Sequence, residues 1–267
     1  MADFTLVRPA GLALSTLVSA EGMRRLLGVT LLVGAYELVA QGSGNRLTPS
    51  LSVIGERLWF DLTSGTLWYH AQLTLFRGFT GLAIAVVAGI VIGILMARSR
   101  WVDAALQPLL GATYPIPRLA LYPLLILILG LGAASKISLV AMECVYPMTL
   151  AAYAGARSVS KDQQWLTRNV GAGWWRTVRD VQIPAALPAI LTGLRVASPI
   201  MLVVIIVTEM LGESRGLGFM IQQSRSFFEP EGVMAVIVVL GVLGFVLDRM
   251  IVALSRVLVF WERKVKL

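Results

Sequence analysis

Long apolar segments alternate with shorter polar segments along the chain. A helix that crosses about 30 Å of hydrocarbon needs roughly 20 apolar residues. Because the apolar residues are continuous rather than alternating, the pattern indicates helices and not the strands of a barrel. The sequence therefore predicts an all-α membrane protein with six transmembrane helices. These are expected at residues 26–41, 73–96, 109–131, 137–156, 185–211 and 233–257.

The first of these helices is the weakest prediction. Residues 26–41 form the shortest apolar segment, and they contain Glu37. A carboxylate within a membrane is costly, so we expect other helices of the bundle to shelter it. The next segment, 42–71, is too polar to span. It predicts an interfacial helix on the outer side, because amphipathic rings settle at membrane interfaces. Its rings of this kind include Trp59, Trp68 and Tyr69.

The pattern divides the chain into four segments. They are an N-terminal cytoplasmic arm (1–25), a first helix with the outer interfacial segment (26–71), a core domain (72–260) and a basic cytoplasmic tail (261–267). The arm is only mildly apolar, is interrupted by Ser and Thr, and carries Asp3. These features favour a retained arm over a cleaved signal peptide.

Basic residues are distributed unevenly between alternate loops. One set of loops and ends holds Arg24, Arg25, Arg98, Arg100, Arg157, Lys161, Arg168, Arg176, Arg179, Arg256, Arg263, Lys264 and Lys266. The other set holds Arg46, Arg57, Lys136, Arg215 and Arg225. Since cytoplasmic loops carry the excess of Lys and Arg, both termini are predicted to be cytoplasmic.

Composition supports a membrane protein and excludes several other classes. The mean hydropathy is +0.78 and only 14% of residues are charged, against about 25% in a soluble domain. The net charge of +8 comes from basic residues between apolar segments, not from one patch, so no nucleic-acid partner is expected. Cys144 and His70 are the only residues of their types. We therefore expect no disulfide within the chain, no metal site and no cofactor.

Prolines are concentrated in the third predicted helix. Pro115, Pro117 and Pro123 each remove a backbone donor and bend or unwind the helix. Within a membrane this is tolerated where neighbours or a water-filled cavity satisfy the freed carbonyls. Two interpretations remain open, a structural kink and a bent helix that lines a translocation path.

The loop between the fourth and fifth helices is the most informative segment. It predicts a helix at 161–170, a turn at 171–173 and a second helix at 174–182. Pro184 and Pro188 are expected to break or redirect the chain as the fifth helix begins. Most connections between helices are shorter, so we favour a docking element over a plain connector. Apolar residues recur at helical spacing in the second helix, at Trp174, Val178 and Val181.

Several motifs in this order resemble one family. The loop is similar to the coupling ("EAA") loop of ABC importer permeases, in which Glu-Ala-Ala is followed by Gly and then by Ile/Leu-Pro. Gly171 matches the glycine, and Ile183 with Pro184 matches the later pair. The segment from about His70 to the C-terminus resembles the nitrate/sulfonate/taurine branch. The motifs are RSR (98–100), YPIPRLALYPLLIL (114–127), LGLGAASKI (129–137), PAALPAILTGLR (184–195) and EMLGESRGLGFMI (209–221).

The loop departs from this family at one point. Trp165, Leu166 and Thr167 occupy the Glu-Ala-Ala positions, so the expected acidic residue is missing. We interpret the chain as the degenerate half of a heterodimer with a second, more standard permease, and a homodimer remains open. The residues that the resemblance assigns to ATPase coupling are Trp165, Leu166, Thr167, Gly171, Trp174, Ile183 and Pro184.

The resemblance implies a type I ABC importer-like fold of six helices, with the coupling helix-turn-helix at about 157–184 between helices 4 and 5. It also implies a multi-pass protein of the bacterial inner membrane that forms the path for a small anionic solute. Nitrate, sulfonates, taurine, bicarbonate and organic acids fit this branch. The implied partners are a second permease, two ATPase subunits that hold ATP and Mg, and an extracytoplasmic substrate-binding protein. The chain has no Gly-x-x-x-x-Gly-Lys-Ser/Thr loop, so it is expected not to be an enzyme.

Charged residues within the predicted helices are candidates for the substrate path. They are Arg77, Arg118, Glu143 and Glu209. Either an arginine attracts the anionic solute, or Glu and Arg form structural pairs between helices. By resemblance, Gly216 and Gly218 begin a segment that closes an outer gate, and a flexible loop is the alternative.

Two other classes of protein are less consistent with the sequence. A secondary transporter driven by an ion gradient is the main alternative, but the chain shows no convincing internal repeat and the long loop would be unexplained. A membrane-embedded enzyme would need clustered His, Asp or Glu near one face, and the chain has one histidine.

Overall fold

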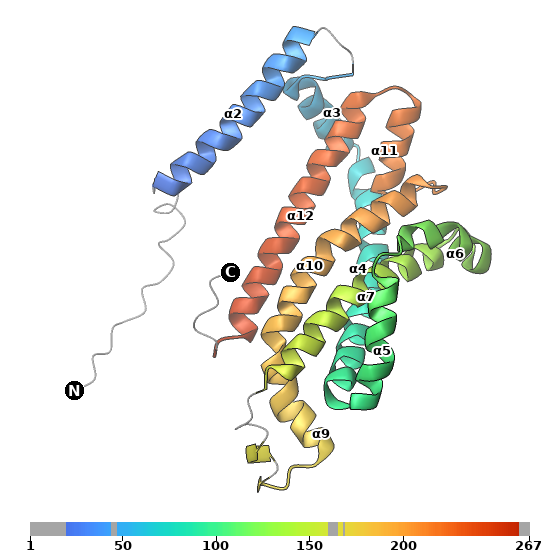
Figure 1. The fold of residues 1–267 in the computed structure, drawn as a ribbon. Coiled ribbons are helices and arrows are strands. Elements are labelled where there is room, and N and C mark those ends of the chain that lie inside the picture. Colours follow the sequence, from blue (N-terminus) through green and yellow to red (C-terminus); the bar gives the residue numbers. More distant parts are fainter. Residues whose placement is uncertain (1–19, 44–46, 160–164, 168, 262–267) are drawn as a thin grey trace.

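The computed structural model describes residues 20–43, 47–159, 165–167 and 169–261 (Figure 1). Most of the predicted N-terminal arm (1–25) and basic tail (261–267) lies outside the described residues. The described part of the chain is helical and contains no strand, which confirms the all-α class. Its elements are α2 (Ala20–Ser43), α3 (Leu51–Thr63), α4 (Thr66–Arg98), α5 (Arg100–Thr113), η1 (Arg118–Leu121), α6 (Tyr122–Leu129), α7 (Ala133–Arg157), α9 (Trp174–Thr177), η2 (Val178–Gln182), α10 (Ile183–Met210), α11 (Leu217–Ser226) and α12 (Pro230–Leu258).

Four helical segments of the described chain are long and apolar enough to cross a membrane. They are α4, α7, the continuous helix Trp174–Met210 and α12. They correspond to the second, fourth, fifth and sixth predicted helices. The bent pair formed by Arg100–Thr113 and Arg118–Leu129 passes the same test as one span. The first predicted helix lies in α2, where the apolar segment Leu26–Gly42 is shorter.

Glu37 of α2 is not sheltered by the bundle, contrary to our expectation. Its Oε2 accepts a hydrogen bond from the Leu51 N–H at 2.8 Å, and its Oε1 accepts one from Gln41 Nε2 at 2.7 Å. Leu51 is the first residue of α3, and the N-terminus of a helix attracts a negative charge. The carboxylate is therefore satisfied locally, at the junction of α2 and α3.

The predicted interfacial segment contains one helix, α3, in which Trp59 is 69% exposed. Gly65 lies between the end of α3 and the start of α4 at Thr66, and it has a positive φ of 77°. Trp68 and Tyr69 consequently lie in the first turn of α4.

The prolines of the third predicted helix produce the expected bend. α5 ends at Thr113, Pro115 and Pro117 follow it, and the two helical parts enclose an angle of 87°. Proline lacks the N–H that would continue the helical ladder and disfavours helical backbone in the residue before it. Pro123 is tolerated because it lies in the first turn of α6.

Pro184 and Pro188 do not break the helix, although a break was one of the two outcomes that we predicted. Helical structure continues from Trp174 to Met210 over 37 residues. The turn before Pro184 is a π-helix, Val178–Gln182. A π-turn shifts the hydrogen-bonding pattern by one residue and so accommodates a position that has no donor.

α7 packs against both α4 and α10 (Figure 1). Its inward face has no exposed area at Val140, Cys144, Met148 and Ala152, four residues at i, i+4 spacing. Cys144 is a free, buried thiol, as expected of a small apolar residue.

Small residues allow these helices to approach closely. Gly81, Ala85, Gly89 and Gly93 form an i, i+4 stripe on α4 that is buried against α7. A Cβ at Gly93 would lie 2.6 Å from the Thr149 carbonyl oxygen, and one at Gly155 would lie 2.8 Å from the Cα of Ala186 in α10. Such stripes are typical of membrane helices, since hydrocarbon gives helices no hydrophobic reason to associate.

We expect Gly89→Ala to destabilise the protein by about 1–3 kcal/mol, the cost of overpacking a tight core. The added Cβ would lie 2.5 Å from Met148 Cβ and 2.9 Å from the Thr149 nitrogen. Thermal unfolding of the detergent-purified chain measures the effect.

Gly111→Ala is the matched control, because a Cβ there meets nothing within 4 Å. Alanine is the better helix former, so this variant should be neutral or more stable by up to about 1 kcal/mol. Equal losses of stability in the two variants would contradict close α4–α7 packing.

Candidate functional site

A buried carboxylate joins three helices at the end of the bundle that carries α11, which we call the α11 end (Figure 1). Glu209, in the last turn of α10, has no exposed area. It accepts hydrogen bonds from Arg77 Nη1 at 2.9 Å and Thr74 Oγ1 at 2.8 Å, both on α4. It also accepts one from the Gly218 N–H of α11 at 3.1 Å. One side chain thus connects α4, α10 and α11.

The N-terminus of α11 is held by this cluster. The Gly218 N–H donates to Glu209, and the Leu217 N–H donates to Thr74 Oγ1 at 2.8 Å. Both are backbone donors of the first turn, which have no partner within the helix. The positive end of the helix dipole also favours the nearby carboxylate.

Gly216 and Gly218 are glycines for a steric reason. Gly216 has a φ of 124°, where side chains are strained, and a Cβ there would collide with the Glu209 carboxylate. A Cβ at Gly218 would collide with the Ile206 carbonyl oxygen. The two predicted gate residues therefore permit α11 to pack directly on Glu209.

A second carboxylate extends the cluster. Glu213 Oε2 lies 3.3 Å from Arg77 Nη2 and 2.8 Å from the Nζ of Lys136, a lysine with no exposed area. Lys136 also donates to the Leu131 carbonyl at 2.7 Å. The two cations, Arg77 and Lys136, balance the two carboxylates, so the cluster as a whole is neutral.

Glu213 lies in the loop between α10 and α11. Burial opposes ionisation of its carboxyl, but hydrogen bonds from Lys136 and the Ser214 N–H, with the charges of Arg77 and Lys136, outweigh burial. The pKa of Glu213 therefore lies below its ordinary value, and the ion pairs persist at neutral pH.

His70 contributes to the same cluster. Its Nδ1 accepts a hydrogen bond from the Gly216 N–H at 2.9 Å, which requires that Nδ1 carry no proton. The ring also contacts Tyr69 and Phe219. Within the described residues, His, Cys, Asp and Glu form no group of three or more that could hold a metal ion.

The other two charged candidates pair with each other at the bend. Arg118 Nη1, in η1, lies 3.4 Å from Glu143 Oε2, in α7. The Arg118 guanidinium also lies 5.1 Å from the ring centroid of Tyr146. The four charged candidates for the substrate path thus form two pairs. Arg77 pairs with Glu209, and Arg118 pairs with Glu143.

Sequence reasoning missed half of the cluster at the α11 end. Thr74 and Glu213 were not singled out, and Lys136 was treated as a loop charge. The available signal was the EMLGESRGLGFMI motif, which contains Glu209, Glu213 and both glycines. The amino-acid sequence does not show that Thr74 and Lys136 contact that motif, because the contact requires α4 and α7 to pack beside α10.

The opposite end of the bundle carries α9, and we call it the α9 end (Figure 1). A group of apolar side chains is exposed there. We name this group the loop surface. It consists of Trp165, Leu166, Val170, Trp174 and Trp175, which are between 52% and 69% exposed. The rings of Trp174 and Trp175 stack with centroids 6.2 Å apart. Exposed apolar clusters of this kind mark interaction sites.

The remaining predicted coupling residues have different positions. Thr167 is 9% exposed, and its carbonyl accepts from the Ala172 N–H at 3.0 Å. Gly171 has a positive φ of 62°, which confirms the glycine turn. Ile183 and Pro184 lie in the first turn of α10. The predicted first helix, 161–170, is helical at residues 165–167 and 169, and residues 160–164 and 168 lie outside the described residues.

Comparison with protein families gives one clear result. Residues 89–259 match the family model described as "Binding-protein-dependent transport system inner membrane component". The matched range includes the bend, the loop surface, Glu209 and α11.

The chain is also similar to individual proteins. It is 34% identical over 216 residues to the taurine transport system permease protein TauC of Escherichia coli (strain K12), covering 81% of this chain and 78% of TauC. It is 33% identical over 201 residues to the putative aliphatic sulfonates transport permease protein SsuC of Bacillus subtilis (strain 168), covering 75% of this chain and 73% of SsuC. These relatives confirm the resemblance to the nitrate/sulfonate/taurine branch.

Among solved structures, the fold is similar to a chain of the inward-facing MetNI methionine ABC transporter. The TM-score is 0.61 at 17% identity, and the match covers 75% of this chain and 97% of that chain. The predicted type I ABC importer-like fold is confirmed.

We expect Arg77→Met to destabilise the protein by about 3–5 kcal/mol, because it leaves Glu209 buried without its cation. The double variant Arg77→Met/Glu209→Gln removes both charges and leaves Lys136 paired with Glu213, so it should recover part of that loss. Thermal unfolding of the purified chain gives both values.

Arg225→Met is the control, since this arginine is exposed on α11. It should change stability by less than about 0.5 kcal/mol. A double variant less stable than the single Arg77→Met variant would show that the pair is not the reason for the burial of Glu209.

Proposed function

The chain belongs to the family of binding-protein-dependent transport system inner membrane components, and from this premise we propose how it acts within an ABC importer. Members of this family are multi-pass membrane permeases, and ATP hydrolysis belongs to separate subunits in such systems. We propose that this permease forms the path for a small anionic solute and is coupled to two ATPase subunits, which hold ATP and Mg. A second permease and an extracytoplasmic substrate-binding protein complete the proposed complex.

The loop surface is the observation that supports the proposed coupling to the ATPase subunits. Five large apolar side chains are exposed at the α9 end, on a segment whose glycine turn matches the coupling loop of ABC permeases. Tryptophan is one of the residues that are enriched among the energetic hot spots of protein interfaces. We assign the ATPase contact to this surface, with Trp165 and Leu166 in place of the acidic and small residues of the usual motif.

The orientation follows from this assignment. If ATPase subunits bind the α9 end, that end is cytoplasmic, and the α11 end faces the substrate-binding protein. The basic residues Arg98, Arg100, Arg157 and Arg176 lie at the α9 end, which agrees with the positive-inside rule. α12 also runs from the α11 end to the α9 end, which supports a cytoplasmic C-terminus (Figure 1).

The nature of the solute rests on relatives. TauC and SsuC are named for taurine and aliphatic sulfonates, so a sulfonate or similar small anion is the class that we propose. For Arg77 and Glu209, the buried neutral cluster supports structural pairing and a role with Gly216 and Gly218 in closing the α11 end. Arg118, on the bent helix pair, is the better candidate for a contact with the solute.

We expect purification of the tagged chain in mild detergent to recover an ATPase. A second, different permease in the same complex would support the heterodimer, and its absence would indicate a homodimer. A chain recovered alone that supports ion-driven uptake would overturn the proposal in favour of a secondary transporter.

Within that complex, Trp174→Ser with Trp175→Ser should weaken ATPase binding by about 30-fold or more, the effect of losing an interface anchor worth roughly 2 kcal/mol. The control is Phe228→Ser, which removes an aromatic side chain that is 86% exposed at the α11 end. If the tryptophan variant recovers as much ATPase as the control does, Trp174 and Trp175 are not part of the interface.

We expect Arg118→Ala to lower solute uptake by about tenfold without abolishing assembly, since a charge-assisted hydrogen bond is worth roughly 1.5 kcal/mol. Arg249→Ala, which removes an exposed guanidinium beside Phe245 of α12, is the control. Unchanged uptake by Arg118→Ala at normal expression would exclude Arg118 from the path.

A further inference from the structure

The only histidine of the chain lies where α4 meets the start of α11. The Nδ1 atom of His70 accepts a hydrogen bond from the Gly216 N–H at 2.9 Å, and Gly216 is buried. In a neutral imidazole one nitrogen accepts and the other carries the proton, so this bond places the proton on Nε2. A doubly protonated ring has no acceptor. The bond to Gly216 therefore depends on the charge of one side chain.

This bond belongs to the attachment of α11 to the bundle. The backbone N–H groups of residues 216, 217 and 218 donate to three different side chains, those of His70, Thr74 and Glu209. A hydroxyl does not titrate in this range, and Glu209 is paired with Arg77. Free imidazole gains a proton near pH 6.5, whereas free carboxylates do so near pH 4. His70 is only partly buried, so protons from solution can reach the one acceptor that responds near neutral pH.

The surroundings of the ring offer little compensation for a positive charge. Two charges act on it, Arg215 of the α10–α11 loop and Asp61 of α3. Arg215 repels an imidazolium, and Asp61 is already engaged with Arg57 at 3.2 Å. The two carboxylates of the cluster at the α11 end are balanced by its two cations. The ring contacts from Tyr69 and Phe219 are uncharged, and the positive end of the α11 dipole lies beside the ring.

We propose that His70 is a proton-sensitive latch on α11. A proton from solution binds Nδ1 and converts the imidazole to an imidazolium, which releases the Gly216 N–H. This buried donor is then left without its acceptor, which is costly, so the start of α11 loosens from the cluster. Because the latched state excludes the proton and the released state accepts it, acid favours the released state.

In the complex, the latch makes closure of the α11 end sensitive to pH on the extracytoplasmic side. This consequence rests on the proposed function and its orientation, whereas the latch itself rests on the contacts of this chain alone.

The test uses the full chain in nanodiscs of phosphatidylcholine, without ATPase or binding protein. Hydrogen exchange is followed by mass spectrometry in the peptide that contains the start of α11, near pH 8 and near pH 5.5. The wild type is compared with His70→Asn at each pH, which cancels the pH dependence of the chemical exchange rate. The Oδ1 atom of asparagine can occupy the place of Nδ1 and accept the same bond, but it does not bind a proton in this range.

We expect the two proteins to exchange at equal rates near pH 8. Near pH 5.5 the wild type should exchange about tenfold faster at the start of α11, the effect of leaving a buried donor unpaired. His70→Leu removes the acceptor, so it should exchange fast at both pH values. His70→Asn keeps the bond, so the comparison does not depend on whether the leucine variant folds.

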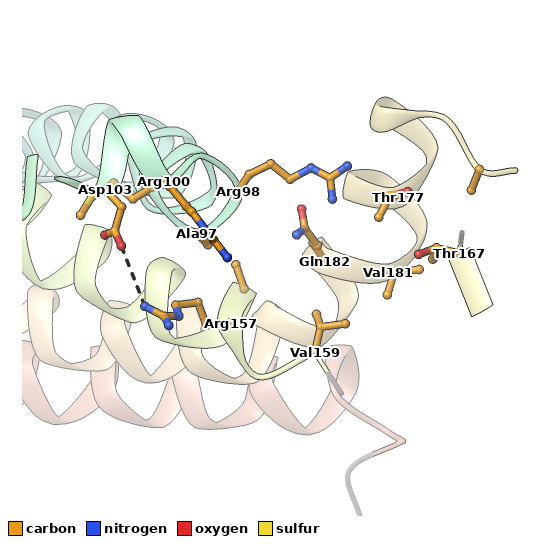
Figure 2. A pocket seen from close by; sticks show the side chains of 13 residues that line it. Ala97, Arg98, Arg100, Asp103, Arg157, Val159, Thr167, Thr177, Val181 and Gln182 are labelled. Atoms are coloured by element: carbon orange, nitrogen blue, oxygen red, sulfur yellow. Dashed lines mark ion pairs between the residues drawn. The ribbon is translucent and has the colours of Figure 1, made fainter. Parts of the chain in front are cut away.

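α5 is the internal control, because its start lies at the opposite end of the bundle. Its Asp103 pairs there with Arg157 of α7 at 3.9 Å, far from the single histidine (Figure 2). Peptides of α5 should therefore exchange equally in the wild type and in His70→Asn at both pH values.

The proposal is overturned if the wild type and His70→Asn exchange alike at the start of α11 at both pH values. It is also overturned if His70→Leu exchanges there as slowly as the wild type near pH 8, since the bond would then not hold α11. Because neither transport nor ATPase is measured, a failure of the proposed function would leave these outcomes unchanged.

Discussion

The burial of the Glu209 carboxylate is the constraint on which the α11 end depends. A charge within a membrane is costly unless it is compensated, and Glu209 has no exposed area. Its compensation requires Arg77 and Thr74 from α4 and the Gly218 N–H of α11. The position of α11, the absence of side chains at residues 216 and 218, and the second layer of ion pairs through Glu213 all follow from that requirement.

Close packing of small residues supplies the frame for this cluster. The glycine stripe of α4 brings its backbone against α7, and Gly155 brings α7 against α10. Neither contact can depend on the hydrophobic effect inside hydrocarbon, so shape complementarity and dispersion hold the three helices together. With α4 and α10 fixed on either side of α7, Arg77 and Glu209 come within hydrogen-bonding distance.

One continuous helix connects the two ends of the molecule. The segment Trp174–Met210 carries two tryptophans of the loop surface at its start and Glu209 in its last turn. Its 37 residues span about 55 Å at 1.5 Å per residue. The π-turn at Val178–Gln182 is the irregular point of this helix.

The sequence alone determined the membrane class, the positions of the long helices, the bend after Thr113 and the family. These follow from apolar runs, from prolines that lack a donor, and from motifs that are contiguous in the chain. The sequence-based predictions failed where the partner of a side chain could not be read from neighbouring residues. They also failed where a local change in the helical hydrogen-bond pattern accommodates a proline. Pro184 was expected to break or redirect the chain, but the helix continues through a π-turn that accommodates the missing donor. Glu37 was expected to need the bundle, but the start of α3 satisfies it. Only the tertiary structure paired Glu209 with Arg77 and buried Lys136, because each arrangement depends on which helix faces pack together.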